Sequence, residues 1–266
     1  MREWTRPAPW RFDGWRLGRS VWPTGERDVP GQLRVSGYVP DTWGDVNLIP
    51  PAVVRHAVSR YSQPGSLVVD PDCGAGTVAV EAIRAGRHGV GVTRHAEWWQ
   101  IARANLSMAK RGGAWPDGLV LDGENSLCWL GLRRRVDLVV TTLRLPAVMD
   151  EDDLDLLVRP QAAVWSSVVR AGGYVVVVVQ QRRYRVGELV DLTSAVMAAG
   201  SAMGLDVVDR SVALIARLRD VRGGLVPLSR RRRWPAIVAH HDVVVLRARE
   251  LVEGTAEEGI GTWRAA

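Results

Sequence analysis

Residues 68–77 read Val-Val-Asp-Pro-Asp-Cys-Gly-Ala-Gly-Thr (VVDPDCGAGT), and this stretch decides which fold the chain can adopt. An apolar run that ends in an acidic residue and continues into Gly-x-Gly is typical of a strand that turns into a helix. Such a turn points backbone N–H groups at a ligand, and its glycines let the ligand approach the backbone. Position 79, where a third glycine would complete the dinucleotide motif, is alanine. The stretch therefore predicts either a ligand site or an ordinary strand-to-helix turn.

Segments on both sides of this turn alternate between helical and strand-like patterns. Residues 51–61 carry apolar side chains at helical spacing, and residues 67–69 form an apolar run that leads into the turn. The further expected helices cover residues 77–86, 95–110, 150–168 and 187–205, and the further expected strands cover residues 88–92, 118–123, 135–142, 172–180, 206–218 and 240–248. Five consecutive valines in the strand at 172–180 are typical of burial on both faces of a parallel sheet. The alternation predicts a doubly wound α/β domain.

Composition limits the class of protein. The 266 residues suffice for one large domain or two small ones, and no apolar run is long enough to span a membrane. Because the N-terminus is charged and aromatic where a signal peptide would be apolar, we expect a cytoplasmic protein without a membrane partner. Cys73 and Cys128 show neither a disulfide framework nor metal-ligand spacing, so both are expected to be reduced and structural.

The basic charge favours a polyanionic partner such as DNA or RNA. The net charge is +6, and the isoelectric point is about 10.1. However, Lys110 is the only lysine among the 35 basic residues, and such an arginine excess also results from a GC-rich coding sequence. Residues 230–234 (RRRRW) could contact phosphates and stack on a base, or form an exposed basic loop. Composition alone leaves both interpretations open.

The segment DPDCGAGT resembles the DPFCGSGT type of motif in the DNA amino-methyltransferases, which methylate the exocyclic amine of adenine or cytosine. The resemblance covers about residues 20–250 and is of the actinobacterial type, with degenerate motifs. It implies a Rossmann-like, seven-stranded methyltransferase sheet with helices on both faces, and S-adenosylmethionine (SAM) as the cofactor. Because the first 45 residues show no sustained period, we expect a methyltransferase-like domain at 46–250 between an irregular N-terminal arm or lid at 1–45 and a tail at 251–266. DNA is the implied partner.

The same resemblance assigns the cofactor-binding positions. They are Asp70, Pro71, Asp72, Cys73, Gly74, Gly76, Thr77, Thr93 and Asp122. Three of these positions depart from the family pattern. Thr93 replaces a carboxylate that accepts hydrogen bonds from both ribose hydroxyls, Asp72 replaces a commonly apolar residue, and Asp122 stands one residue away from the usual acceptor of the adenine amine. We therefore expect SAM binding to be weak or absent.

The catalytic motif also departs from the family pattern. In the resembling enzymes a polar residue, two prolines and an aromatic residue end the fourth strand, where they accept hydrogen bonds from the target amine and stack on the flipped base. Here these positions hold Thr142, Leu143, Arg144 and Leu145. A guanidinium only donates hydrogen bonds, so it cannot accept one from a base amine. The acidic run at 150–155 either disfavours DNA or forms a solvated helix start.

Two hypotheses about function follow. The first is a catalytically silent relative that keeps the fold as a binding or assembly module, with an active methyltransferase paralogue or a second copy of itself as partner. The second is an active DNA methyltransferase in which Thr142 orients the base amine. His240, His241 and Asp242 invite a metal interpretation, but adjacent histidines before an apolar run are more typical of a strand start, so no metal site is predicted.

Overall fold

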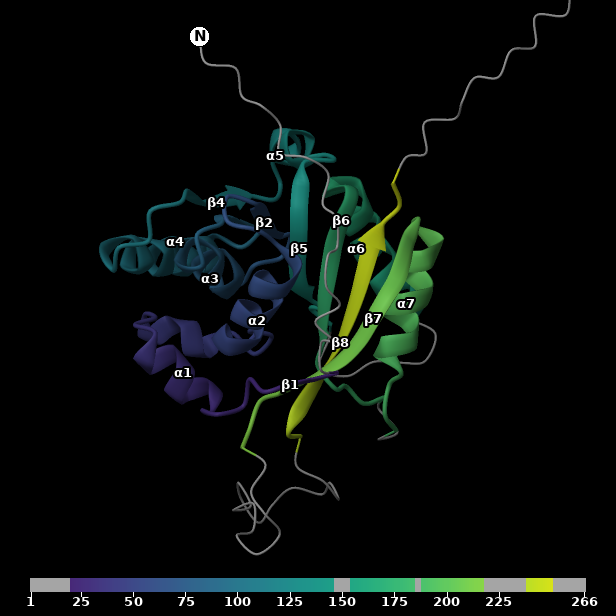
Figure 1. Cartoon of the computed structure of the whole chain (residues 1–266), viewed down its shortest axis with the longest axis horizontal. Coiled ribbons are helices and arrows are strands. Elements are labelled where there is room, and N and C mark those ends of the chain that lie inside the picture. Colours follow the sequence, from purple (N-terminus) through teal and green to yellow (C-terminus); the bar gives the residue numbers. More distant parts are fainter. Residues whose placement is uncertain (1–19, 146–153, 185–187, 218–237, 251–266) are drawn as a thin grey trace, which may run out of the picture.

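The computed structural model describes residues 20–145, 154–184, 188–217 and 238–250, which form one eight-stranded sheet with helices on both faces (Figure 1). The elements are β1 (Val21–Trp22), α1 (Val29–Val35), the 3-10 helix η1 (Pro40–Gly44), α2 (Pro51–Tyr61), β2 (Leu67–Asp70), α3 (Thr77–Arg84), β3 (His88–Thr93), α4 (Ala96–Arg111), β4 (Gly118–Asp122), α5 (Ser126–Leu132), β5 (Val136–Thr142), α6 (Leu154–Val168), β6 (Val169–Val179), α7 (Leu192–Ala202), β7 (Leu205–Leu214) and β8 (His240–Ala248). The predicted α/β class is confirmed.

The strand order places the glycine turn where ligands bind in such sheets. The order is β1-β7-β8-β6-β5-β2-β3-β4, and only β8 runs antiparallel to its neighbours. From β2 the chain first builds outward through β3 and β4, and then returns to the other side of β2 with β5. Loops leave β2 and β5 in opposite directions at such a reversal, which opens a crevice at the carboxyl ends of these strands. The turn after β2 lies at this crevice.

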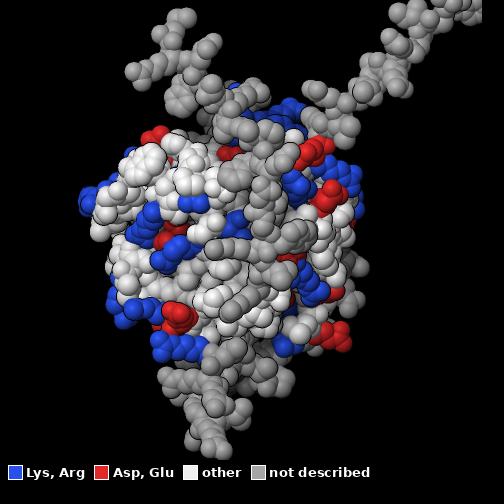
Figure 2. All heavy atoms as spheres, viewed as in Figure 1, with Lys and Arg blue, Asp and Glu red and all other residues white. Residues whose placement is uncertain are grey.

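Charged groups of both signs are interspersed on the face of the molecule seen in Figure 2. The net charge of +6 is therefore not gathered into one basic field on this side of the described structure. Among the described residues, no helix is both long and apolar enough to cross a membrane.

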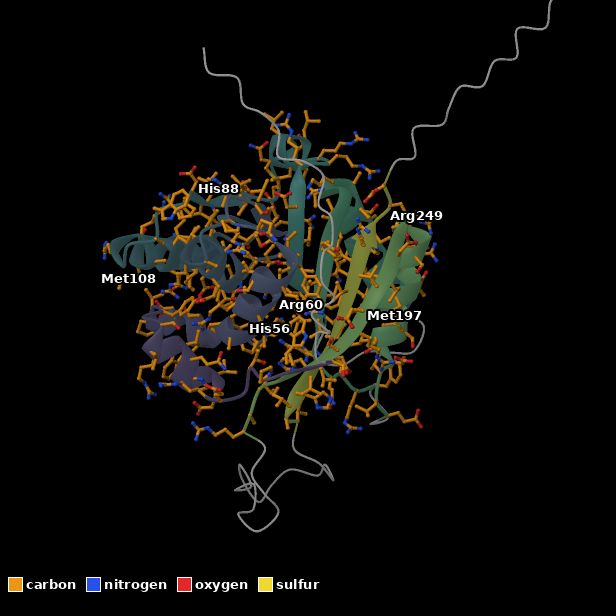
Figure 3. All side chains as sticks on the ribbon, viewed as in Figure 1. His56, Arg60, His88, Met108, Met197 and Arg249 are labelled. Carbon is orange, nitrogen blue, oxygen red and sulfur yellow. The ribbon has the colours of Figure 1, made fainter. Side chains whose placement is uncertain are left out.

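Residues 20–45 differ from the expected irregular arm. They form β1, α1 and η1, and Trp22 is almost fully buried against the domain. The Trp22 ring lies 4.5 Å, centroid to centroid, from that of His56 on α2, which is labelled in Figure 3. β1 adds an eighth strand beside β7, where the family resemblance predicted seven. The sequence pattern missed these elements because β1 has two residues and α1 has seven, which are too few to show a helical period.

The rest of the predicted arm, residues 1–19, and the predicted tail, residues 251–266, lie outside the described residues. One further helix, α5, has no counterpart among the predicted elements. The helix expected at 187–205 begins at Leu192, because the side chain of Asp191 caps it by accepting a hydrogen bond from the backbone N–H of Ser194 at 3.0 Å.

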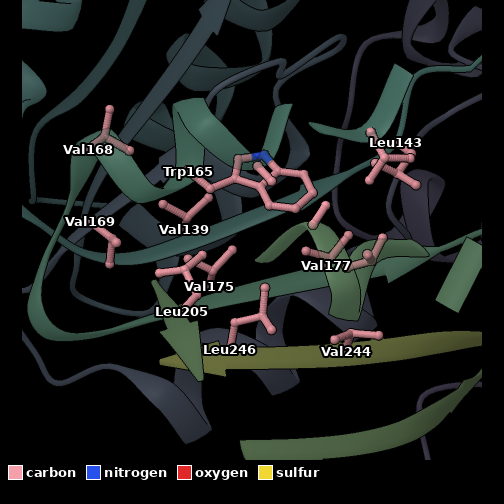
Figure 4. Close-up of a cluster of buried hydrophobic side chains, with 14 of the residues drawn as sticks. Val139, Leu143, Trp165, Val168, Val169, Val175, Val177, Leu205, Val244 and Leu246 are labelled. Carbon is pink, nitrogen blue, oxygen red and sulfur yellow. The ribbon is translucent and has the colours of Figure 1, made fainter. Parts of the chain in front are cut away.

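The sheet is buried on both faces, as the valine run predicted. Val176 and Val178 of β6 face a cluster built with α2 and α3, whereas Val175, Val177 and Val179 face a second cluster built with α6 and α7. Figure 4 shows the second cluster, in which Trp165 of α6 lies over the sheet valines. A third cluster joins α3 to α4 and α1. The central strands are therefore rigidly positioned, and with them the ends of β2 and β5.

Candidate functional site

The turn after β2 depends on two glycines with left-handed backbone conformations. Gly74 has φ +47° and Gly76 has φ +81°, both of which disfavour residues with a side chain. A Cβ atom at Gly76 would lie 2.8 Å from the Cβ of Ala102, so this glycine also allows close packing of the turn against α4. The turn is tied to β3 by the backbone N–H of Cys73, which donates to the carbonyl of Val92 at 2.9 Å. This is the predicted strand-turn-helix unit.

Asp70 ends β2 as a buried carboxylate. Only 4% of its surface is exposed. It accepts a hydrogen bond from Thr141 Oγ1 at 3.0 Å and one from the backbone N–H of Asp72 at 3.1 Å. Burial raises the pKa of Asp70 to about 7, even though these hydrogen bonds and the nearby Arg144 favour the ionised form. Asp70 is therefore partly protonated near neutral pH.

An ion pair between Arg144 and Asp45 lies directly over this turn. Nη1 and Nη2 of Arg144 each donate to one carboxylate oxygen of Asp45 at 3.1 Å, in a bidentate arrangement. Nε of Arg144 lies 3.1 Å from Oδ1 of Asp72 and donates to the Asp72 carbonyl at 3.0 Å. Oδ2 of Asp45 also accepts from the backbone N–H of Ala75 at 2.9 Å. One carboxylate thus joins the segment before α2, the glycine turn and the end of β5.

This ion pair occupies the space that the glycine leaves open. A Cβ atom built on Gly74 would overlap Nη2 of Arg144 and Oδ2 of Asp45. The side chains are largely buried, with 18% of Arg144 and 2% of Asp45 exposed. The residues present therefore do not accommodate the methionine end of SAM in this arrangement. Asp45 was not among the predicted site residues, and it lies 99 positions from Arg144, so no local pattern pointed to the pair.

The predicted ribose and adenine positions have separate environments. Thr93 is buried, and its hydroxyl accepts a hydrogen bond from the backbone N–H of His95 at 3.2 Å. Asp122 pairs with Thr93 in the β3–β4 ladder but is exposed, and its carboxylate accepts from the backbone N–H of Glu124 at 2.9 Å. Thr93 at the expected ribose position thus directs its side chain to the backbone two residues further on.

The remaining predicted turn residues are mostly structural. Cys73 is buried, and burial raises the pKa of its thiol well above the ordinary value, as expected for a structural cysteine. Its sulfur packs against Gly91, where a Cβ atom would lie 2.7 Å from Sγ. Thr77 is buried at the first turn of α3, whereas Pro71 and Asp72 are half-buried.

The predicted catalytic segment is folded into the protein. Thr142 is 2% exposed, and its hydroxyl donates to the carbonyl of Val178 on β6 at 2.7 Å. Leu143 and Leu145 are buried in the core cluster that contains Trp165, and Figure 4 labels Leu143 beside it. Of the four motif positions only Arg144 reaches the crevice, where it pairs with Asp45. This segment offers the crevice a donor but no acceptor side chain.

The weaker sequence signals add no further site. Within the described ranges, no group of three or more His, Cys, Asp and Glu side chains is arranged to hold a metal ion. His241 is largely buried in β8, and burial lowers its pKa to about 4, so this side chain is neutral. The basic run 230–234 and residues 150–153 lie outside the described residues.

Part of this site matches a known family model. Residues 45–104 match the family model of the DNA methylases. The matched segment begins at Asp45 and contains the complete glycine turn, so the predicted resemblance to the DNA amino-methyltransferases is confirmed. No protein among the curated sequences matches the chain.

The superposition on TrmN confirms the methyltransferase fold. TrmN from Thermus thermophilus superposes with a TM-score of 0.52 at 15% sequence identity, over 79% of this chain and 52% of the TrmN chain. A SAM-dependent methyltransferase from Methanosarcina mazei gives a TM-score of 0.48 at 14% identity, over 77% of this chain and 100% of the other. This chain thus spans about half the length of TrmN. Its fold is the Rossmann-like fold of the SAM-dependent methyltransferases.

Proposed function

We propose that this DNA methylase relative binds DNA without transferring a methyl group to it. The observation that carries the proposal is the burial of the catalytic segment. Amino methylation needs acceptors that reach the base amine, but Thr142 is 2% exposed and its hydroxyl is directed to the Val178 carbonyl inside the sheet. Leu143 and Leu145 are core residues, so neither is placed to stack on a base. Each preorganised polar group that is missing commonly costs about 2.7–4 kcal/mol of transition-state stabilisation.

A basic site at the opposite edge of the sheet supports DNA binding. The arginines at positions 133, 134 and 135 are exposed just before β5, and none forms an ion pair with an acidic side chain within the described part of the chain. Other arginines at this edge are paired: Arg170 lies 2.6 Å from Asp137, and Arg249 lies 2.9 Å from Asp206. In Figure 2 the upper edge of the molecule, where Figure 1 places α5, carries basic side chains.

The location of this basic site agrees with a non-catalytic role. The arginine run precedes β5, so it lies at the amino edge of the parallel strands, whereas the glycine turn follows β2 at their carboxyl edge. Phosphates bound by the arginine run would therefore not bring a base to the turn. Phosphate contacts of this kind give affinity without reading sequence.

The direct test combines methyl transfer with DNA binding. Wild-type protein is incubated with SAM labelled in its methyl group and with unmethylated genomic DNA, and we expect no labelled DNA. Fluorescence anisotropy with a labelled duplex should show binding, and an RNA of the same length serves as the competing ligand. Turnover by the wild type that disappears in Thr142→Ala would establish the active enzyme instead. Stronger binding to the RNA than to the duplex would show that RNA, and not DNA, is the partner.

A further inference from the structure

We infer that the Arg144 guanidinium is an internal cation that occupies the place of the cofactor's methionine end. By occupying it, Arg144 prevents this chain from binding SAM. The inference rests on the proposed function, because only a protein without methyl transfer can keep this place filled. It goes further by naming the residue that excludes the cofactor.

The charge arrangement fits a bound cation. Three carboxylates surround the Arg144 guanidinium: Asp45 pairs with both terminal nitrogens, Asp72 contacts Nε, and Asp70 lies close enough for Arg144 to favour its ionised form. The planar guanidinium matches a carboxylate bidentately, which a single ammonium group does not. The guanidinium therefore satisfies the anionic groups of the crevice from within the chain.

The Arg144–Asp45 pair also occupies a backbone N–H group that could otherwise donate a hydrogen bond to the carboxylate of a ligand. The methionine end of SAM carries a carboxylate together with two cationic groups, the ammonium and the sulfonium. The N–H of Ala75, in the glycine turn ahead of α3, is a donor suited to such a carboxylate, but here it donates to Asp45 at 2.9 Å. Arg144 thus takes the place of the positive charge of the methionine end, and Asp45 takes the place of its carboxylate.

The segment that supplies Asp45 is held in place independently of Arg144. The side-chain amide of Asn105 on α4 donates to Thr42 Oγ1 at 2.8 Å and to the Ala75 carbonyl at 2.9 Å. Its oxygen accepts from the backbone N–H of Val39 at 2.9 Å. Because these neutral hydrogen bonds bind residues 39–45 to the glycine turn, a variant without Arg144 should still fold.

The test measures SAM binding by isothermal titration calorimetry in four proteins. They are the wild type, Arg144→Ala, the double variant Arg144→Leu/Asp45→Asn, in which the bidentate partner of Arg144 is neutralised as well, and Arg159→Ala as control. Arg159 forms an exposed pair with Asp155 on α6, far in the chain from the glycine turn. Circular dichroism and thermal melting establish that each variant is folded.

We expect the wild type and Arg159→Ala to show no binding tighter than millimolar, and at least one folded Arg144 variant to bind SAM at least tenfold more tightly. Micromolar affinity in the wild type overturns the inference, as does a failure of every folded Arg144 variant to bind SAM more tightly than the wild type. The readout is binding, so it is independent of the methyl-transfer assay. An Arg144 variant that binds SAM and leaves DNA unmethylated supports both proposals, whereas wild-type methyl transfer contradicts the proposed function itself.

Discussion

Neighbouring side chains set the chemistry of Asp70 and Arg144. Burial raises the pKa of Asp70 to about 7, so a residue expected to be an anionic cofactor ligand is partly neutral. Burial alone would lower the pKa of Arg144, but the hydrogen bonds and charge of Asp45 outweigh this effect and raise it. The guanidinium therefore stays charged, and Asp45 is the carboxylate that holds it.

Asp70→Asn should flatten the dependence of stability on pH. The pKa of about 7 in the folded protein lies above the usual 3.8, so the folded state binds this proton more tightly than the unfolded chain. The resulting stability is complete below pH ~4 and is lost as the pH rises through ~7. Between pH 5 and pH 8 the wild type should lose roughly 2–3 kcal/mol more than the variant in urea unfolding. Identical pH profiles would show that Asp70 is ionised throughout.

Arg134→Gly should stabilise the protein. Arg134 is the one non-glycine residue with positive φ in the described chain, at 55°, and this conformation costs a residue with a side chain about 1–3 kcal/mol. Glycine removes that cost but gains freedom in the unfolded chain, so we expect a net gain of roughly 1 kcal/mol in unfolding free energy. Arg133→Gly is the matched control, since φ is −55° there and the same change should destabilise. Equal effects at both positions would contradict the explanation.

At the scale of elements, the segment before α2 belongs to the folded domain. β1 pairs with β7, and η1 lies at the glycine turn through Thr42, which accepts a hydrogen bond from Asn105. Leu33 of α1 and Tyr38 pack in the cluster that joins α3 and α4. The predicted lid is therefore, over its described part, a fixed layer that carries Asp45 to the crevice.

Trp22→Ala should cost about 3–5 kcal/mol of unfolding free energy, because it leaves a large cavity beside α2. The indole N–H of Trp22 has no hydrogen-bond partner among the described residues, so the loss is one of packing, and Trp22→Phe should cost less. Trp115→Ala is the control, since that side chain is 73% exposed, and it should change stability by less than about 0.5 kcal/mol. Guanidinium unfolding measures all three variants. Similar small losses for Trp22→Ala and Trp115→Ala would mean that β1 is dispensable.

At the scale of the whole molecule, the two edges of the sheet differ in whether the arginines named above are paired with carboxylates. At the carboxyl edge Arg144 is paired with Asp45 inside the protein, whereas the amino edge exposes the arginine run 133–135. If DNA binds, the affinity should come from this run and from the net charge of +6.

DNA affinity should therefore fall steeply with salt and depend little on base sequence. In Arg133→Ser/Arg134→Gly/Arg135→Ser, the slope of log K against log salt should decrease by about 0.9 for each phosphate that the variant no longer neutralises. Anisotropy titrations at several salt concentrations, with two duplexes of unrelated sequence, measure both effects. Preference for one duplex, or an unchanged slope in the triple variant, would remove the arginine run as the binding site.

The sequence by itself predicted the α/β sheet, the glycine turn and the resemblance to the DNA methylases. These features are local: valine runs report burial on both faces, and Gly74 and Gly76 report the left-handed turn between β2 and α3. The departures from the family motif at Thr93 and at the end of β5 could also be recognised in the sequence, because each concerns the residue type at a single position. Most elements of six or more residues could be predicted, because they are long enough to show their period.

Only the tertiary structure decided what those departures do. The register of β5 with β6 places Thr142 opposite Val178 and inside the sheet, and the packing of α6 draws Leu143 into the core. The pairing of Arg144 with Asp45 joins side chains 99 positions apart. The pattern of apolar residues shows which side chains of one segment are buried. Contacts between distant segments depend instead on how the whole chain folds. For that reason the sequence indicated departures from the family motif, and only the fold showed that Arg144 and Asp45 form an ion pair over the glycine turn.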